Sequence, residues 1–471
     1  MLDSIRTAFT LPDLRRRILF TIGIMVIYRL TANIPVPGVD LNAWFTFTNS
    51  GAQGGLLGVL DMLSRGAVSN FSVMAMGVYP YITASIIIQL ITPIIPYLRE
   101  LQEEGEQGRN RITKITYYFT VPLAIAQAVG QIRLIGFSFA GTAGGDVLSQ
   151  ILPQFGFSSA ANILPTLTTL LAMVGGTMFA IWLGELITEN GIGQGISLII
   201  FSGIASQIPQ NLLGLFTTTE TDNTARIFSL AAFIIITLVT VFVIVMVQEG
   251  ERRIPVQYSR QMRGRKMYQG QRSHLPLKVN TAGMIPIIFA QALLTFPPLL
   301  ASFFVPTGLA VENEGGLVGF ARSVSEGFNA GSDPALNGIA FSLYWIMTFL
   351  FVAGFTFFYT DVMIKQQRLA QNLQQRGGFV PGIRPGKKTS EYITAVVRRI
   401  TFVGAIFLAT ISVLPGIMQF LGWALNIPGL GQSAFVINGA GLIIVVGVVL
   451  DTMRQIEAQL IMRNYESTIT G

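Results

Sequence analysis

Residues 228–247 read FSLAAFIIITLVTVFVIVMV, an unbroken stretch without a charged side chain. A helix that crosses a hydrocarbon core about 30 Å thick needs about 20 mostly apolar residues, because lipid offers no partner for an unpaired peptide group. The stretch therefore predicts a transmembrane helix. The composition extends this prediction to the whole chain, since 51% of the residues are hydrophobic and only 12% are charged, against about 25% charged residues in soluble proteins.

Nine further apolar windows, trimmed at charges and at Pro/Gly turns, have comparable lengths. The first comes after Arg15, Arg16 and Arg17, but no small-x-small cleavage site follows it, so we expect a retained helix rather than a cleaved signal peptide. The predicted fold is an all-α integral membrane protein with ten transmembrane helices and both termini on one side. The ten windows are 18–34, 72–98, 116–138, 160–184, 195–215, 228–248, 280–301, 337–360, 400–420 and 435–453.

The basic residues orient these helices. Of the 31 Lys and Arg residues, all but five fall in the N-terminal segment, the tail, or the second-to-third, sixth-to-seventh and eighth-to-ninth connections. Because cytoplasmic flanks collect Lys and Arg, we expect these segments and both termini on the cytoplasmic side of the membrane. The exceptions are Arg29, Arg65, Arg133, Arg226 and Arg322.

Two of the basic connections, 249–278 and 361–399, are longer than ordinary loops. Loops of that length are usually functional or disordered, and their charge suits anionic lipid head groups, an acidic protein surface or ribosomal RNA. Ordinary positive-inside topology explains most of the charge but does not readily explain the length of these loops. The residues alone leave open whether these loops dock a partner.

Few residues in the chain could carry out catalysis. Cysteine is absent and His274 is the only histidine, so disulfides, thiolate nucleophiles and Cys/His metal sites are not expected. Gly191, Gly193 and Gly195 do not form a nucleotide loop, because Ile196 stands where G-x-G-x-x-G requires its last glycine. A phosphate loop at 381–389 is also rejected, since it would begin at a proline. We expect no enzyme, no cofactor and no metal.

Two prolines mark breaks in the apolar windows. Pro80 falls in the second window and Pro286 in the seventh, five windows apart, as expected for counterparts in two five-helix halves, 1–215 and 216–471. Paired breaks indicate a site at the interface of the halves, although kinks are common in membrane helices. A secondary transporter of a small polar solute remains an alternative, but it should carry ionisable groups at mid-membrane depth. The charges lie mainly near window ends, and we expect Glu185 to cap a helix or to form a structural pair rather than to bind an ion.

Several motifs resemble those of the SecY family. The longest is GVYPYITASIIIQL at 77–90, which resembles the second helix of the family. Others are similar to the junction of the fourth and fifth helices, the start of the seventh helix and the last large cytoplasmic loop. Together with YES at 465–467, the resemblance extends over essentially the whole chain. These shorter motifs are WLGE at 182–185, GIGQGIS at 191–197, HLPLKVN at 274–280 and FVPGIRPG at 379–386.

The resemblance implies a protein-conducting channel between two pseudo-symmetric halves. It would move unfolded secretory proteins across the cytoplasmic membrane and release membrane segments sideways into lipid. A plug segment is implied at 58–71, with Asp61, Ser64, Arg65 and Asn70 as its polar residues. The channel waist would be closed by six residues, here called the aliphatic ring: Val78, Ile82, Ile196, Ile200, Ile288 and Ile444.

The resemblance also implies a lateral gate and a docking surface. Gln89, Gln127 and Asn280 match polar gate positions, where interhelical hydrogen bonds are weak enough to break when a signal sequence arrives. Further implied partners are the SecE and SecG subunits, signal-sequence-bearing preproteins and anionic lipids. The arginines implied to dock the SecA ATPase or the ribosome are Arg252, Arg253 and Arg384.

Overall fold

The computed structural model describes residues 9–44, 71–143, 150–156, 160–217, 223–258, 261–263, 266–268, 272–301, 303–304, 319–320, 323–324, 327–328, 338–367, 369–375, 377–424 and 439–470. Within these ranges, each of the ten apolar windows contains one principal helix. The ten helices are α2 (Pro12–Thr31), α5 (Tyr79–Ile91), α7 (Glu106–Ala143), α9 (Ala160–Asn190), α10 (Gly195–Thr217), α11 (Asn223–Glu249), α12 (Ile285–Ala301), α14 (Gly338–Gln367), α16 (Lys387–Ala424) and α17 (Gly439–Thr470).

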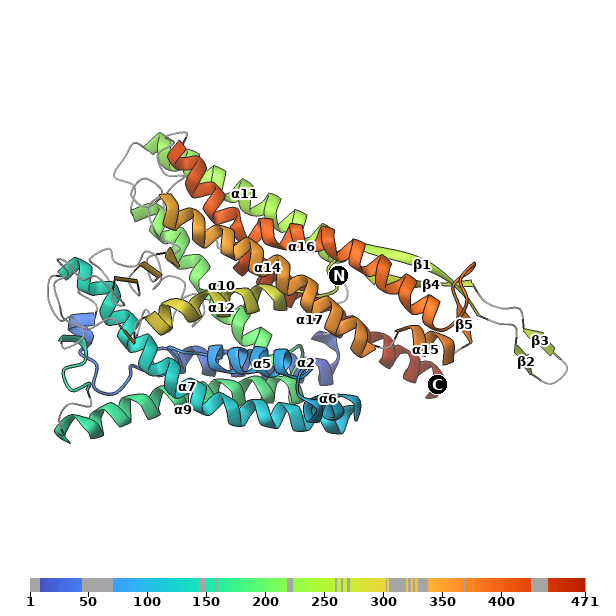
Figure 1. Ribbon diagram of the computed structural model, residues 1–471, viewed down its shortest axis with the longest axis horizontal. Coiled ribbons are helices and arrows are strands. Elements are labelled where there is room, and N and C mark those ends of the chain that lie inside the picture. Colours follow the sequence, from blue (N-terminus) through green and yellow to red (C-terminus); the bar gives the residue numbers. More distant parts are fainter. Residues whose placement is uncertain are drawn as a thin grey trace.

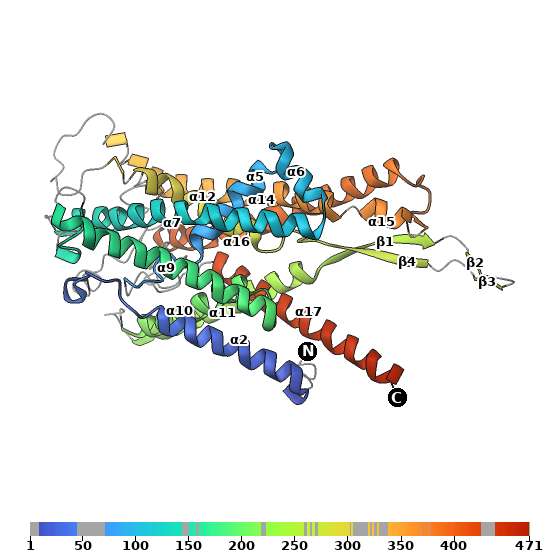
Figure 2. The same ribbon diagram turned by 90° about the horizontal axis from the view of Figure 1, so that it is seen from below.

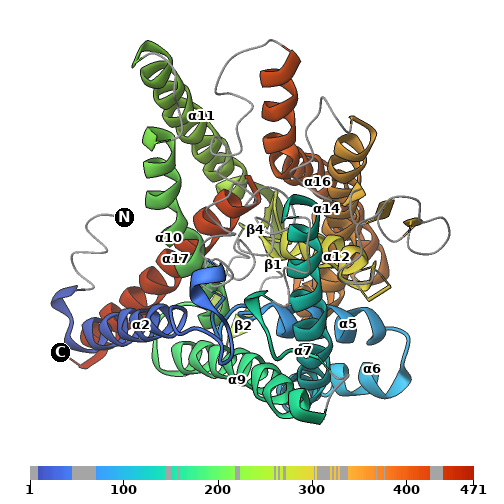
Figure 3. The ribbon, with the colours of Figure 1, turned by 90° about the vertical axis from the view of Figure 1, so that its left-hand side faces the viewer.

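The helices form an elongated bundle with a β-hairpin projecting from one end (Figure 1). That end also carries the C-terminal part of α17 and the short helices α6 (Pro96–Glu103) and α15 (Leu369–Gln375), as Figure 2 also shows. Viewed along the bundle in Figure 3, α2, α5, α7 and α9 form one side, while α11, α14 and α16 form the other. The two groups correspond to the earlier and the later parts of the chain.

The second window is not one straight helix, which corrects the expected span 72–98. Helix α5 ends at Ile91, and α6 follows at an angle of 102°. Both α5, with 13 residues, and α12, with 17, are shorter than a full crossing requires. At 1.5 Å per residue, α5 is only about 20 Å long.

Pro80 and Pro286 also play a different part from the one expected. They occupy the first turns of α5 and α12 rather than interrupting those helices. Proline is well tolerated there, because the first amides of a helix have no intrahelical acceptor. Helices α7 and α16 do contain internal prolines, Pro122 and Pro415. Each of the two short helices therefore begins one residue before a proline and follows a turn.

The described residues include five helices long and apolar enough to cross a membrane, or six if the bent pair α5–α6 counts as one span. Three shorter apolar segments lie at Gly195–Ser206, Ile234–Glu249 and Ile285–Ala301. Helix α11 exposes one stripe at four-residue spacing, Leu238, Phe242 and Met246, each at least 60% accessible. A large exposed apolar stripe of this kind suits lipid contact rather than water.

The long basic loops contain β-strands, which the sequence did not predict. Strands β1 (Glu251–Tyr258) and β4 (Arg272–Lys278) pair antiparallel, and β5 (Gly378–Phe379) adds to the other edge of β1. At the tip, β2 (Gln261–Arg263) pairs with β3 (Lys266–Tyr268). The three-stranded sheet therefore joins the loop 249–278 to the loop 361–399.

A small hydrophobic core fixes this sheet to the bundle. Ile254 and Val256 of β1 pack in one cluster with Leu373 of α15 and Val397 of α16. A much larger core at the centre of the molecule draws residues from α2, α5, α9, α10, α11, α12, α14, α16 and α17. Buried threonines inside the helices mostly bond their own backbone, as Thr356 Oγ1 does to the Val352 carbonyl at 2.6 Å.

Candidate functional site

The six residues of the aliphatic ring come from four helices. Val78 caps α5 and Ile82 follows one turn later, while Ile196 and Ile200 occupy the first two turns of α10. Ile288 lies on α12 and Ile444 on α17. Two of these helices belong to the earlier part of the chain and two to the later part.

All six side chains belong to the large central core. Five are less than 9% accessible and Ile196 packs against them as a partly buried member. Aliphatic side chains offer no coordination to an ion that must shed its hydration shell. An array of this composition can therefore close a path to ions, and it can part around a peptide without breaking specific bonds.

The three predicted gate amides do not form one hydrogen-bonded cluster. Gln127 Nε2 donates to Thr83 Oγ1 at 3.2 Å, which joins α7 to α5. Gln89 bonds Ser85 on its own helix, and Asn280 bonds the Gly283 carbonyl in the turn before α12. Among the described residues no hydrogen bond connects two of these amides.

Two of the amides keep an unused acceptor. The side-chain oxygens of Gln127 and Asn280 are buried and have no hydrogen-bond partner. An unpaired buried acceptor costs about 1–3 kcal/mol, so each oxygen would gain from a donor that came within reach. The geometry thus favours two separate polar positions over a single amide cluster.

The contact between α5 and α12 contains a residue that the sequence reading did not select. Tyr79, only 6% accessible, donates from its hydroxyl to the Ala292 carbonyl at 3.0 Å and also bonds Thr295 Oγ1. These partners lie more than 200 residues away in the chain. The aromatic hydroxyl beside Pro80 was visible in the sequence, but nothing there indicated its partners.

Helix α12 is held on two other sides by apolar contacts. Phe289 meets Phe355 and Tyr359 of α14 edge to face, at ring distances of 6.1 and 6.0 Å. On the α7 side, Leu299 packs so closely over Gly130 that an added Cβ would come within 2.8 Å of it. Near the end of α12, the Arg133 guanidinium lies 5.4 Å from the Phe303 ring centre.

A cavity of about 1380 Å³ opens between the two groups of helices, toward the end that carries α6 and α15. Gln89, Arg99 and Arg109 line it from α5, α6 and α7, and Asp361 and Arg398 line it from α14 and α16. Arg398 is paired with Asp361 at 3.7 Å. The predicted gate residue Gln89 therefore faces a cavity between the groups of helices that has charged as well as apolar residues in its lining.

The three predicted docking arginines are exposed at the hairpin end. Arg252 and Arg253 lie on β1, and Arg253 forms an ion pair with Glu251 at 2.7 Å. Arg384 lies in the turn between β5 and α16, flanked by Gly382 and Gly386 with positive φ angles. Because β5 pairs with β1, the segments that carry these arginines meet at the three-stranded sheet β4-β1-β5, here called the sheet platform.

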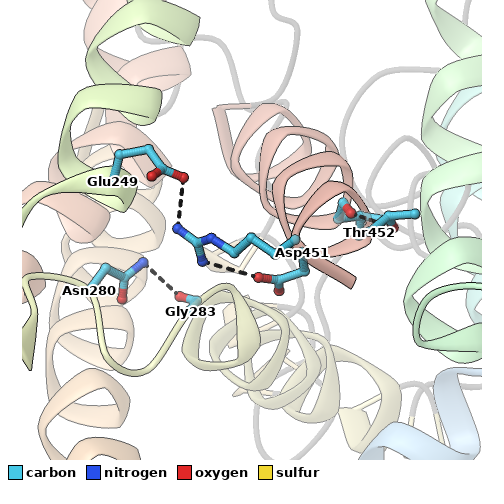
Figure 4. Close-up of polar contacts among 7 residues, drawn as sticks. Glu249, Asn280, Gly283, Asp451 and Thr452 are labelled. Atoms are coloured by element: carbon cyan, nitrogen blue, oxygen red, sulfur yellow. Dashed lines mark hydrogen bonds and ion pairs between the residues drawn. The ribbon is translucent and has the colours of Figure 1, made fainter. Parts of the chain in front are cut away.

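The base of the hairpin is tied to α17, as Figure 4 shows. Arg454 of α17 bonds Glu249, the last residue of α11, at 2.7 Å and lies 3.5 Å from Asp451. The next residue, Gln455, accepts a hydrogen bond from the Gly193 amide at 2.9 Å. One turn of α17 thus contacts both the hairpin base and the junction between α9 and α10.

The predicted plug lies outside the described residues except for its last position. Asp61, Ser64, Arg65 and Asn70 are among the residues that the structure does not describe. Phe71 is buried, and its ring meets Trp44 edge to face at 5.0 Å. The plug remains a prediction.

The sequence is similar to proteins of a known family along nearly its whole length. The SecY family profile matches residues 72–453. The protein translocase subunit SecY of Streptomyces scabiei is 39% identical over 473 residues, covering 99% of both chains. That of Thermus thermophilus is also 39% identical, covering 100% of this chain and 98% of the relative.

Solved structures agree in fold. A structure described as that of a protein conducting channel superposes with a TM-score of 0.59 at 17% identity, covering 96% of each chain. Sec61 in the canine ribosome-channel complex from the endoplasmic reticulum superposes with a TM-score of 0.57 at 16% identity, also covering 96% of each chain. At such identities the superpositions speak for the fold, which is the all-α architecture of these channels.

Proposed function

The chain belongs to the SecY family, and we propose that it forms the channel through which unfolded secretory proteins cross the cytoplasmic membrane. The relatives are protein translocase subunits along their full length, so a transporter of small solutes is not favoured. The observation that carries the proposal is the aliphatic ring, in which residues from four helices of both halves share one buried core.

The path would run between the two halves, 1–215 and 216–471. Apolar segments would leave sideways between α5 and α12, whose shared surface is short because both helices are short. The plug, 58–71, would add a second closure on one side of the ring. The large cavity beside Gln89 supports an approach to this surface from the hairpin end.

The orientation in the membrane follows from charge. The exposed arginines of the hairpin and of the turn before α16 belong on the cytoplasmic side, together with both termini. Arg252, Arg253 and Arg384 would contact an acidic or phosphate-rich partner, because the guanidinium binds such groups bidentately. We assign these contacts to the SecA ATPase and the ribosome, with SecE and SecG as membrane subunits and anionic lipids around the basic end.

Energy for transport would come from such a partner rather than from this chain. Its residues would provide the path, the seal and the lateral exit. A signal sequence, itself an apolar helix, would separate α5 from α12 and so open the ring and displace the plug.

Site-specific crosslinking tests the path. A photoreactive amino acid is placed at position 82, 196 or 288, and a secretory chain is stalled part-way through the complete translocase in membranes. We expect crosslinks to the stalled chain at all three positions. The control is position 238 on the exposed stripe of α11, where we expect crosslinks to lipid only. Absence of substrate crosslinks at the ring, with crosslinks elsewhere in the bundle, would overturn the path.

A further inference from the structure

The contact between α5 and α12 combines a small apolar surface with buried hydrogen bonds. Ile82 and Ile288 belong to the same core, and beside them the Tyr79 hydroxyl reaches the last part of α12. Tyr79, Ala292 and Thr295 are all at most 6% accessible. The bonds are therefore shielded from water and lipid.

Both hydroxyls can be satisfied in this arrangement. Tyr79 can donate to the Ala292 carbonyl while Thr295 donates to the tyrosine oxygen, or Tyr79 can donate to Thr295 while Thr295 donates to the Gln291 carbonyl at 3.2 Å. Each hydroxyl has a single proton, and in either arrangement each donates once. The pair needs no further partner as long as α5 and α12 stay together.

Separation of the helices affects the two residues differently. Thr295 keeps acceptors on its own helix, since its hydroxyl lies 3.0 Å from the Ala292 carbonyl and 3.2 Å from that of Gln291. Tyr79 loses both of its α12 partners. A buried tyrosine hydroxyl usually has a hydrogen-bond partner. Separation of the helices therefore costs Tyr79 more hydrogen-bond energy than it costs Thr295.

The other contact of α12 is of a different kind. Toward α14 it presents Phe289 between two aromatic rings, without a hydrogen bond in that set. Ring contacts of this type tolerate small rotations, whereas a hydrogen bond is lost over a short displacement. Movement of α12 away from α5 would therefore keep its aromatic contacts with α14 and break the bonds of Tyr79.

We propose that the Tyr79 hydroxyl, through Ala292 and Thr295, sets how strongly an apolar segment must bind before α5 and α12 separate. This inference rests on the proposed function, because it concerns the lateral exit of that channel. A ligand shifts a closed–open equilibrium only by its differential affinity for the two states. Bonds made only in the closed state therefore discriminate against weakly apolar signal segments.

The test compares two precursors in proteoliposomes that contain the complete translocase. One precursor carries an intact signal sequence, and the other carries the same sequence with one apolar residue replaced by a charged one. The variants are Tyr79→Phe, which removes only the hydroxyl, Thr295→Val, which keeps the side-chain shape, and the two combined. Tyr81→Phe is the matched control, because Tyr81 lies on the same helix but stacks on Tyr117 of α7.

We expect the ratio of weakened to intact precursor transport to rise about three-fold to ten-fold in Tyr79→Phe, the range that one membrane-buried hydrogen bond covers. Thr295→Val should raise it less, because the Ala292 carbonyl still accepts from Tyr79. The combined variant should fall short of the product of the single effects, as expected for residues that share one interaction. Tyr81→Phe should leave the ratio unchanged.

The outcomes separate this inference from the function on which it rests. Failure of the unaltered protein to move the intact precursor would overturn the proposed function. Transport of the intact precursor by every variant, with an unchanged ratio in Tyr79→Phe, would overturn the role of Tyr79 and leave the channel standing. A ratio that rose equally in Tyr81→Phe would also overturn it, since general loosening of α5 would then be the cause.

Discussion

Two adjacent glycines of α9 differ in what surrounds them. A Cβ at Gly176 would lie 2.1 Å from the Val73 carbonyl oxygen, whereas a Cβ at Gly175 would meet nothing within 4 Å. Only Gly176 allows the turn before α5 to approach α9. The same distinction could not be made from the sequence, where the two residues are equivalent neighbours.

We expect Gly176→Ala to destabilise the protein by about 1–3 kcal/mol, because backbone must move to admit the methyl group. Gly175→Ala is the control and should stabilise by about 0.5–1 kcal/mol, since alanine favours the helix. Thermal unfolding of the purified proteins in one detergent measures both. Equal shifts in the two variants would contradict the close approach.

The aliphatic ring makes a second prediction at the scale of residues. Simultaneous replacement of Ile82, Ile196 and Ile288 by Ala should make the resting channel leak ions, because the smaller side chains leave space for water at the waist. Conductance of single channels in planar bilayers measures the leak. The control replaces the exposed residues Leu164, Leu238 and Phe242 by Ala, and the ring hypothesis fails if both triple variants conduct alike.

Residue assignments depended on different kinds of information. The six ring positions followed from motif resemblance, since an isolated Ile in an apolar window is usually a packing or lipid-facing residue. The gate amides lie at buried or half-buried positions, but the sequence did not indicate their hydrogen-bond partners, and their role in a gate stays a prediction. Tyr79 and Thr295 could not be paired at all, because 215 intervening residues separate the two partners.

At the scale of elements, hydropathy predicted the positions of the helices in the sequence better than it predicted where they bend. Each window contains a helix, yet the bend between α5 and α6 was missed, because a hydropathy average carries no direction. Pro93 and Pro96 stand at that bend, and proline restricts both itself and the residue before it. The strands of the basic loops were not predicted, because the charge of these loops was interpreted as a sign of orientation and of possible docking, and not as part of a strand pattern.

The sheet platform gives a prediction for these loops. Val256 is 2% accessible in the small core formed with α15 and α16, so Val256→Asp buries a charge there and should disorder the platform. Limited proteolysis of the protein in membranes should then cleave the hairpin several-fold faster. The control is Ser273→Asp, at the paired position of β4 but exposed. Equal cleavage of the two variants would mean that this core does not hold the hairpin.

At the scale of the whole molecule, the distribution of Lys and Arg residues predicted that one end would be basic. The hairpin, α6, α15 and the C-terminal part of α17 do lie at that end (Figure 2). Charge and span number could predict this arrangement together, because each additional span reverses the side of every later loop. How the two halves pack could not be predicted, since it depends on contacts between residues hundreds of positions apart.

Partner docking is proposed for that basic end. We expect Arg384→Glu to reduce SecA-driven precursor transport by at least ten-fold while the variant still inserts into the membrane, because the change reverses charge in an exposed turn. Binding of SecA to translocase vesicles and transport are measured together. Lys114→Glu, an equal charge change on the exposed start of α7, is the control. Normal SecA binding by Arg384→Glu would remove this arginine from the docking surface.

The relation between the halves gives the last prediction. The chain has no cysteine, so an engineered pair reacts alone with a reducible reagent that links two thiols. Cysteines at 79 and 295 connect α5 to α12 across the halves, whereas cysteines at 81 and 117 connect α5 to α7 within one half. If transport requires the halves to separate at α5 and α12, the first link should stop it and reduction should restore it.

The second link should leave transport nearly unchanged, because α5 and α7 would move together. The comparison depends on linking yield, which gel mobility after proteolysis between the cysteines measures for each pair. Full transport at complete linkage of 79 to 295 would mean that the peptide passes without separation of these helices. Inhibition by both links would instead indicate that α5 moves alone, against α7 as well as α12, and the moving unit would then be one short helix rather than a half of the molecule.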